Sequence, residues 1–417
     1  MRRRPRAAWY DWVNTGAKLT EDERQMTVGG WGGLLRGREG ELLLDLVFVF
    51  ALTRFSERLV EDFTTDRRVV LPEVGQTALL LLALWLVWVQ AAFVTSRYDT
   101  RQPVIQLLIV WTMFGSLIMA VALPHAFGAR GVVFAVTYVA IQVGRPVIFL
   151  LTRHGPGRRR AARYLCWGAV SAVPWIAGAA LFPQSPARGV LWTLAIALDC
   201  TGFVLGWPVP GLGRTGAEDW KAVGEHLAQR YQQFIIITIG ETILLTGMTF
   251  ANEFTPDRVL PTVVSFATAV LMWRIYFHHA GTVFPAAVEA ASRPGRLSKS
   301  GFYTHLVMVT GILATGVGYA LVIHEPRGHE NPLWLAVIFG GPALFLVGRS
   351  RLEYEVFSRV SASRVVGLLA LAALTPVMLH RAPTIATSAV AVVLAGVAVW
   401  DGLREWRRPD EAPSPLR

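Results

Sequence analysis

Long apolar stretches recur along the whole chain, and segments that are charged or rich in Pro and Gly separate them. A bilayer requires about 20 consecutive apolar residues of helix, so each stretch is long enough to span a membrane. The twelve candidate spans are about 42–60, 76–95, 104–123, 131–151, 164–182, 189–206, 231–250, 259–279, 301–323, 332–348, 365–380 and 384–402. The pattern predicts an all-α integral membrane protein with about twelve transmembrane helices.

The composition agrees with this class. Of the 417 residues, 53% are hydrophobic and 17% are charged, which excludes an ordinary soluble globular protein. The two cysteines, Cys166 and Cys200, lie in apolar runs without the spacing of a zinc site, and no nucleotide-binding glycine loop is present. The sequence therefore indicates no metal and no cofactor.

The basic residues are sorted along the chain. Lys and Arg concentrate in the two tails and in the even-numbered loops, which predicts that both termini are cytoplasmic. This sorting explains the formal net charge of +11, so the expected partner is the lipid bilayer and no nucleic acid is required. The expected parts are a basic N-terminal tail, a six-helix half, a cytoplasmic connector, a second six-helix half and a C-terminal tail, at 1–40, 41–206, 207–230, 231–403 and 404–417.

Among the charged side chains within apolar spans, five are candidates for buried ion pairs. The acids are Asp45, Asp199 and Glu241, and the bases are Arg145 and Arg274. Charges inside a membrane are costly, so they usually face a partner or a polar cavity. We therefore expect Arg145 or Arg274 to neutralise one of the three acids. Glu241 falls nearest the middle of its span.

Two stretches place ionisable side chains on one helix face. Glu41 and Asp45 are four residues apart, as are His226 and Arg230, so each pair shares a face. Glu241 follows Arg230 by eleven residues, which returns it to nearly the same face about 16 Å deeper. Asp45 either pairs with an arginine and fixes helix packing, or acts as a protonatable group. Arg230 either joins a proton relay or extends to the headgroups.

The same two stretches resemble the motifs of a known family. Residues 41–51 read ELLLDLVFVFA and residues 226–243 read HLAQRYQQFIIITIGETI. Both are similar to signatures of the bacterial low temperature requirement A family, and the resemblance extends over about 36–405. It implies a polytopic protein of the bacterial cytoplasmic membrane without a defined activity. Gln229 stands where the family motif has Glu, which puts in doubt any proton role carried by that Glu.

Several features suggest an internal duplication. Spans one and seven each carry an acid, Asp45 and Glu241, at a depth that we expect to be comparable, and spans two and eight each carry a tryptophan cluster containing Trp88 or Trp273. Spans four and ten share a Val-Gly-Arg sequence at 143–145 and 347–349. Six helices per half would give a parallel repeat about an axis along the membrane normal. The interface between the halves is then the expected site.

Three functions fit this pattern. The first is proton-coupled movement of a small solute or lipid, with Asp45 and Glu241 as proton donor and acceptor in one cavity between the halves. The second is an intramembrane enzyme for a lipophilic substrate, such as acid-initiated isoprenoid cyclisation, with either acid as general acid. The third is a structural factor without turnover. The residues expected around the cavity are Glu41, His226, Arg230, Arg274, Arg145, Asp199, Trp88 and Trp273.

Overall fold

The computed structural model describes residues 38–64, 70–183, 185–216, 224–291, 294–327 and 332–407. These residues form helices, and no strand occurs among them. The longer helices are α3 (Arg38–Thr64), α4 (Val70–Arg97), α5 (Pro103–Ala122), α6 (Gly131–Thr152), α7 (Gly155–Leu181), α8 (Pro186–Leu205), α10 (Gly224–Asn252), α11 (Pro256–Phe277), α12 (Ala280–Ala290), α13 (Pro294–His324), α14 (Pro332–Phe357), α15 (Ala362–Val377) and α16 (Pro383–Arg407). The predicted all-α class is confirmed.

Local sequence signals explain several helix ends. Pro103 and Pro256 begin α5 and α11, where the missing backbone N–H would have no helical partner in any case. The Ser185 hydroxyl accepts a 3.3 Å hydrogen bond from the backbone N–H of Ala187 and caps α8. Gly206 ends α8 in the left-handed conformation, at φ 78°.

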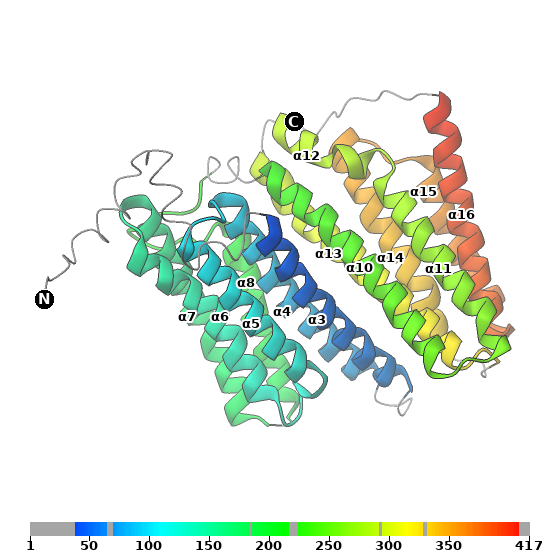
Figure 1. The fold of residues 1–417 in the computed structure, drawn as a ribbon, viewed down its shortest axis with the longest axis horizontal. Helices are drawn as coiled ribbons and strands as arrows, with labels where there is room; N and C mark the ends of the chain where they lie inside the picture. The colour runs from blue at the N-terminus through cyan, green and yellow to red at the C-terminus, as the bar shows by residue number, and fades with distance from the viewer. Residues whose placement is uncertain are drawn as a thin grey trace, which may run out of the picture.

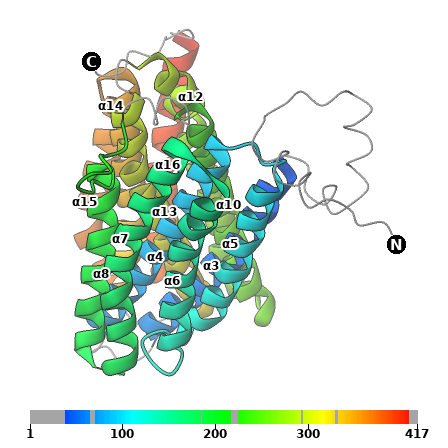
Figure 2. The same ribbon diagram turned by 90° about the vertical axis from the view of Figure 1, so that its left-hand side faces the viewer.

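Eleven of the described helical segments are long and apolar enough to cross a membrane. They include every predicted span except the first. The helix α3 has sufficient length but too many charged side chains, among them Glu41, Asp45, Arg54 and Glu57. It nevertheless packs between α4, α5, α10 and α13, alongside the spanning helices (Figures 1 and 2).

The helices form two groups that lie side by side, α3 to α8 and α10 to α16 (Figure 1). In the first group α3 contacts α4 and α5, the chain then packs in sequence from α5 to α8, and α8 returns to α4. In the second group α10 contacts α11 and α13, the chain packs in sequence from α13 to α16, and α16 returns to α11. Helices at the same position in the two groups thus have the same neighbours. This is the pattern that a six-helix duplication predicts, with α12 as an insertion in the second group.

The outer surface is apolar. Large side chains such as Phe114, Val190, Leu369 and Val392 are more than half exposed on the helices. An apolar surface of this extent suits contact with lipid. The buried polar side chains instead collect where helices meet, and they define the candidate site.

Candidate functional site at the contact between α3 and α10

Asp45 and Arg230 form the centre of the candidate site. The two terminal nitrogens of Arg230 each donate a 2.8 Å hydrogen bond to a different carboxylate oxygen of Asp45. Both residues are almost completely buried, at 2% and 1% exposure. A planar guanidinium matches a carboxylate in this two-bond geometry, so the pair is strong and directional. The interpretation in which Asp45 pairs with an arginine is confirmed, and Arg230 does not extend to the headgroups.

Trp88 of α4 completes the environment of Asp45. Its indole N–H donates a 3.1 Å hydrogen bond to the same carboxylate, and its ring lies 5.9 Å from the Arg230 guanidinium carbon. The indole is fully buried. It stacks on Trp85, with ring centroids 5.2 Å apart, and packs at a tilt against Phe234, with ring centroids 4.2 Å apart. This aromatic cluster excludes water from one side of the ion pair.

Glu41 and His226 extend the cluster by one helix turn. The Glu41 carboxylate lies 3.8 Å from the His226 ring and 3.8 Å from Arg230. The other ring nitrogen of His226 is 2.9 Å from the hydroxyl of Ser96, at the end of α4. The predicted shared faces, Glu41 with Asp45 and His226 with Arg230, are therefore confirmed by their common contacts.

The positions that meet across α3 and α10 keep a constant offset of 185 residues, the separation between Asp45 and Arg230. The same offset relates Glu41 to His226, and Ser56 to Glu241. A constant difference means that the two helices run parallel, because antiparallel helices would show a constant sum. Parallel first helices agree with a parallel repeat.

This register corrects the expected depths of the two acids. Asp45 is level with Arg230, whereas Glu241 lies eleven residues further along α10, at the level of Ser56. Eleven helical residues correspond to about 16 Å. The prediction that Asp45 and Glu241 lie at comparable depth is wrong, because the register of the helix contact decides which positions face each other.

Glu241 is fully buried, and neither of its carboxylate oxygens has a hydrogen-bond partner among the described residues. The polar side chains of α3 that interact electrostatically with the Glu241 carboxyl are those of Ser56 and Glu57. The Ser56 hydroxyl is also buried and also lacks a hydrogen bond. On its other side α10 packs closely on α13, where Gly316 leaves room for Thr242.

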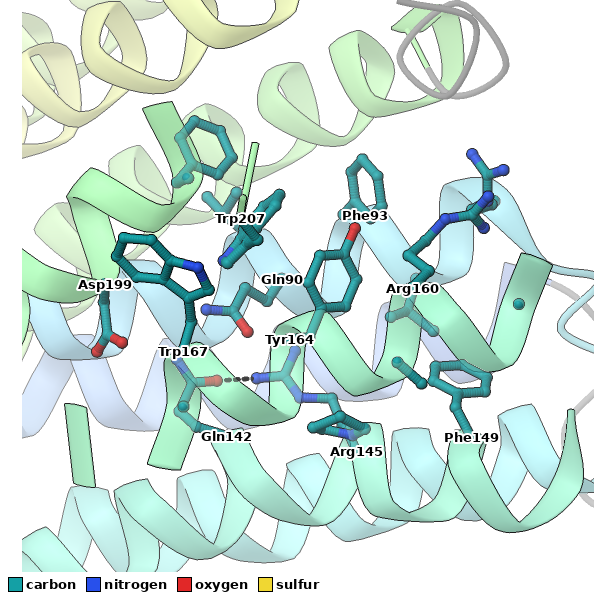
Figure 3. A pocket seen from close by; sticks show the side chains of 18 of the residues that line it. Gln90, Phe93, Gln142, Arg145, Phe149, Arg160, Tyr164, Trp167, Asp199 and Trp207 are labelled. Atoms are coloured by element: carbon teal, nitrogen blue, oxygen red, sulfur yellow. Dashed lines mark hydrogen bonds between the residues drawn. The ribbon is translucent and has the colours of Figure 1, made fainter. Parts of the chain in front are cut away.

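Arg145 and Asp199 lie elsewhere, along a cavity between α4, α6, α7 and α8 (Figure 3). A chain of hydrogen bonds joins them: Arg145 donates to Gln142, Gln142 donates to the Tyr138 hydroxyl at 3.1 Å, and that hydroxyl donates to Asp199 at 2.7 Å. Both residues therefore belong to a second site within the first helix group.

The expected ion pairs of Arg145 and Arg274 are not formed. Among the described residues, Arg230 and Trp88 donate to Asp45, Tyr138 donates to Asp199, and Glu241 faces the Ser56 hydroxyl. Arg274 is partly buried on α11, with its guanidinium 3.5 Å from a ring nitrogen of His278. The prediction is wrong because it considered only arginines inside apolar spans, whereas Arg230 enters from the end of α10.

Two other predicted residues lie outside the cluster. Trp273 is 47% exposed on α11, so it faces outward and not into a cavity. The Gln229 side chain donates a 3.4 Å hydrogen bond to Glu225 on the exposed side of α10. The Gln229 side chain therefore makes this contact outside the Asp45 cluster.

Sequence reasoning missed several polar partners. Gln233 accepts a 2.9 Å hydrogen bond from Arg230, Ser96 meets His226, and Ser56 faces Glu241. Gln233 and Gln142 had a local signal, since each lies three residues from an arginine of its own helix. Uncharged polar residues are common in membrane helices, so contacts across helices are needed to identify the others.

The fold and the buried charges define a polytopic helical membrane protein with a polar cluster where two helix groups meet. A model of the family described as bacterial low temperature requirement A protein (LtrA) matches residues 39–399, and the chain belongs to this family. The chain is also similar to a protein of Rhizobium meliloti (strain 1021) whose name calls it uncharacterized, with 36% identity over 376 residues, 88% of this chain and 90% of that protein. It is therefore a multi-pass membrane protein of a bacterial family.

Proposed function

We propose that the protein couples a proton to the movement of a small solute or lipid, with Glu241 as the proton-carrying group. The observation that supports this is the buried Glu241 carboxyl, which has no basic partner among the described residues and faces only the neutral hydroxyl of Ser56 as a donor. An ionised carboxylate in such a position costs several kcal/mol. The carboxyl therefore holds its proton in this arrangement, and it ionises only when the contact around it opens.

The position of Glu241 supports a link between proton release and helix movement. Its side chain meets Ser56 across α3 and α10, which belong to different helix groups. Water or a cation can reach the carboxyl only if α10 separates from α3 or from α13. Proton release and a change in the contact between the groups would then occur together, as alternating access requires.

The Asp45 and Arg230 ion pair has a different part in this proposal. It connects the same two helices about 16 Å from Glu241, and its two hydrogen bonds satisfy both charges. Such a pair holds the register of α3 and α10 while the region around Glu241 opens. We therefore propose that Asp45 fixes the point about which α3 and α10 separate, and that it does not transfer the proton.

The enzyme alternative has less support. Acid-initiated cyclisation needs a proton donor that faces the substrate cavity. Asp45 is held by Arg230, and Glu241 faces Ser56, so neither lines the aromatic cavity of the first helix group. The acid that lines that cavity is Asp199, which accepts a hydrogen bond from Tyr138.

The proposal is tested without knowledge of the substrate by measuring access to the Glu241 contact. In a Ser56→Cys variant that also carries Cys200→Ala, the rate of thiol labelling at position 56 is compared with that at the exposed Cys166. This ratio corrects for the intrinsic effect of pH on the reagent. We expect the ratio to rise with pH, because an ionised Glu241 requires water, and to become independent of pH in Glu241→Gln.

Glu57→Gln is the matched control, since Glu57 is the charged neighbour of Glu241 and is partly exposed. This variant should retain the pH response. The proposal would be overturned if the labelling ratio of the Ser56→Cys, Cys200→Ala protein did not change with pH. It would also be overturned if adding Glu241→Gln left the pH response of that ratio unchanged.

A further inference from the structure

The cavity between α4, α6, α7 and α8 has a charged wall and an aromatic wall. Its empty space is about 900 Å³, a volume that includes open solvent at its mouth. Arg145 extends into it from α6, next to Gln142, and Phe93, Tyr164, Trp167 and Trp207 line the remaining sides (Figure 3).

Arg145 is only 4% exposed, yet it makes no ion pair among the described residues. It donates hydrogen bonds to the neutral side chain of Gln142 and to the carbonyl oxygen of Ile141 in its own helix. A buried guanidinium normally has an anionic partner, because the cost of removing its charge from water is otherwise not offset. The site thus lacks a counter-charge for Arg145.

In the second helix group, backbone carbonyls hold the corresponding arginine. Arg349 follows the same Val-Gly sequence as Arg145, and it donates to the carbonyl oxygens of Ile275 (2.9 Å) and His278. These carbonyls are free because α11 ends at Phe277. In the first group α4 continues to Arg97, so its carbonyls are used within the helix and none is left for Arg145. In the first group the Arg145 guanidinium lines the cavity instead.

The charges along the cavity favour one class of ligand. Three arginines, at 97, 145 and 160, line it against the single carboxylate of Asp199. The hydrogen-bonded chain through Tyr138 and Gln142 holds Arg145 in place from the Asp199 side. A cation would meet the arginines, and a fully polar anion would leave the aromatic wall without a partner.

We infer that this cavity binds a single-chain amphiphile with one anionic head, a carboxylate or a phosphate, whose head pairs with Arg145 and whose chain lies along the aromatic wall. A guanidinium can donate two parallel hydrogen bonds to either a carboxylate or a phosphate. This inference goes beyond the proposed function and does not depend on transport, because binding at Arg145 requires no movement at Glu241.

The test uses four probes that share one chain and differ in the head: hexadecanoate, hexadecyl phosphate, hexadecanol and hexadecylamine. Their affinity for the full-length protein in a neutral detergent is measured by thermal shift and by native mass spectrometry. We expect one or both anions to bind at least tenfold more tightly than the alcohol and the amine, and the preferred anion identifies the head. Arg145→Gln should remove this preference, whereas Arg274→Gln, an arginine of α11 outside this cavity, should retain it.

Equal affinity for all four probes, or an unchanged preference in Arg145→Gln, would overturn the inference. If Arg145→Gln does not fold, Gly168→Leu provides the decision, since Gly168 lines the cavity and a Cβ there meets no atom closer than 3.7 Å. This variant keeps Arg145 but fills the space, and it should exclude both anions; normal binding would count against the site. The measurement uses no proton gradient, so its result is separate from that of the labelling experiment at Ser56.

Discussion

Asp45 and Arg230 are joined by two hydrogen bonds of 2.8 Å across the contact between α3 and α10, although 185 residues separate them in the chain. Asp45 lies in the first stretch that resembles a family signature, 41–51, and Arg230 lies in the second, 226–243. The two signatures are thus the two sides of one helix contact. The contact joins the first helices of the two helix groups through a buried ion pair.

The first prediction concerns this ion pair. Asp45→Asn and Arg230→Gln should each destabilise the protein by about 3–5 kcal/mol, because each leaves a buried charge without its partner. The double variant should be much less destabilised than the sum of the two. Thermal unfolding of the four proteins in detergent gives the coupling energy of the cycle.

The pair of Arg54 and Glu57 provides the control for this cycle. Their side chains are 33% and 39% exposed, and such pairs contribute about 0–1 kcal/mol. A coupling energy at Asp45 and Arg230 as small as that of the control pair would show that the buried pair does not hold the two helices together.

The second prediction concerns the indole of Trp88. Trp88→Phe retains most of the ring packing but removes the N–H that donates to Asp45, so we expect a loss of about 1–3 kcal/mol. Trp273→Phe changes the same atoms at a position that is 47% exposed and should alter stability by less than about 0.5 kcal/mol. Equal changes in the melting temperature of the two variants would contradict a role for the hydrogen bond to Asp45.

These residues show what the sequence could predict. The spacing of Glu41 with Asp45, and of His226 with Arg230, was sufficient to assign each pair to one helix face, because helix geometry is local. The spacing did not show which acid meets which arginine, since that depends on the register of two helices far apart in the chain. Arg230 lies just before the apolar run at 231–250, so hydropathy alone favoured Arg145 and Arg274.

The cavity was less predictable than the ion pair. Arg145 and Asp199 were identified as intramembrane charges, but they belong to different helices and are connected only through Tyr138 and Gln142. The space beside Arg145 exists because α4 continues where α11 ends, and this difference is visible only when the two groups are compared in three dimensions.

The third prediction concerns topology. Single cysteines near Pro124, Pro183 and Pro326 should react with a membrane-impermeant reagent added from outside the cell, and cysteines near Gly157 and Gly295 should not. The reason is the concentration of Lys and Arg in the loops of the second set. The parent for this series carries Cys166→Ala and Cys200→Ala, and reversal at two positions would contradict the assignment.

The same labelling series decides whether α3 crosses the membrane. Eleven apolar spans alone would place the two termini on opposite sides, whereas a spanning α3 places both in the cytoplasm. We expect both tails to be protected from the external reagent, because α3 runs parallel to α10 along its contact from Glu41 to Ser56. Labelling of only one tail would show that α3 does not cross the membrane.

The last prediction separates the two buried acids by their effect on stability. Glu241 has no hydrogen-bond donor, so Glu241→Leu removes an unsatisfied polar group and should leave stability unchanged or raise it by about 1–3 kcal/mol. Asp45→Leu should instead destabilise the protein, because it strands the Arg230 guanidinium. Thermal unfolding of both variants, with Glu241→Gln as the isosteric control, tests the contrast. Since Leu cannot release a proton, Glu241→Leu should also eliminate the dependence of Ser56→Cys labelling on pH. If it destabilises the protein as strongly as Asp45→Leu, Glu241 holds a structural contact, and its assignment as the proton carrier loses its basis.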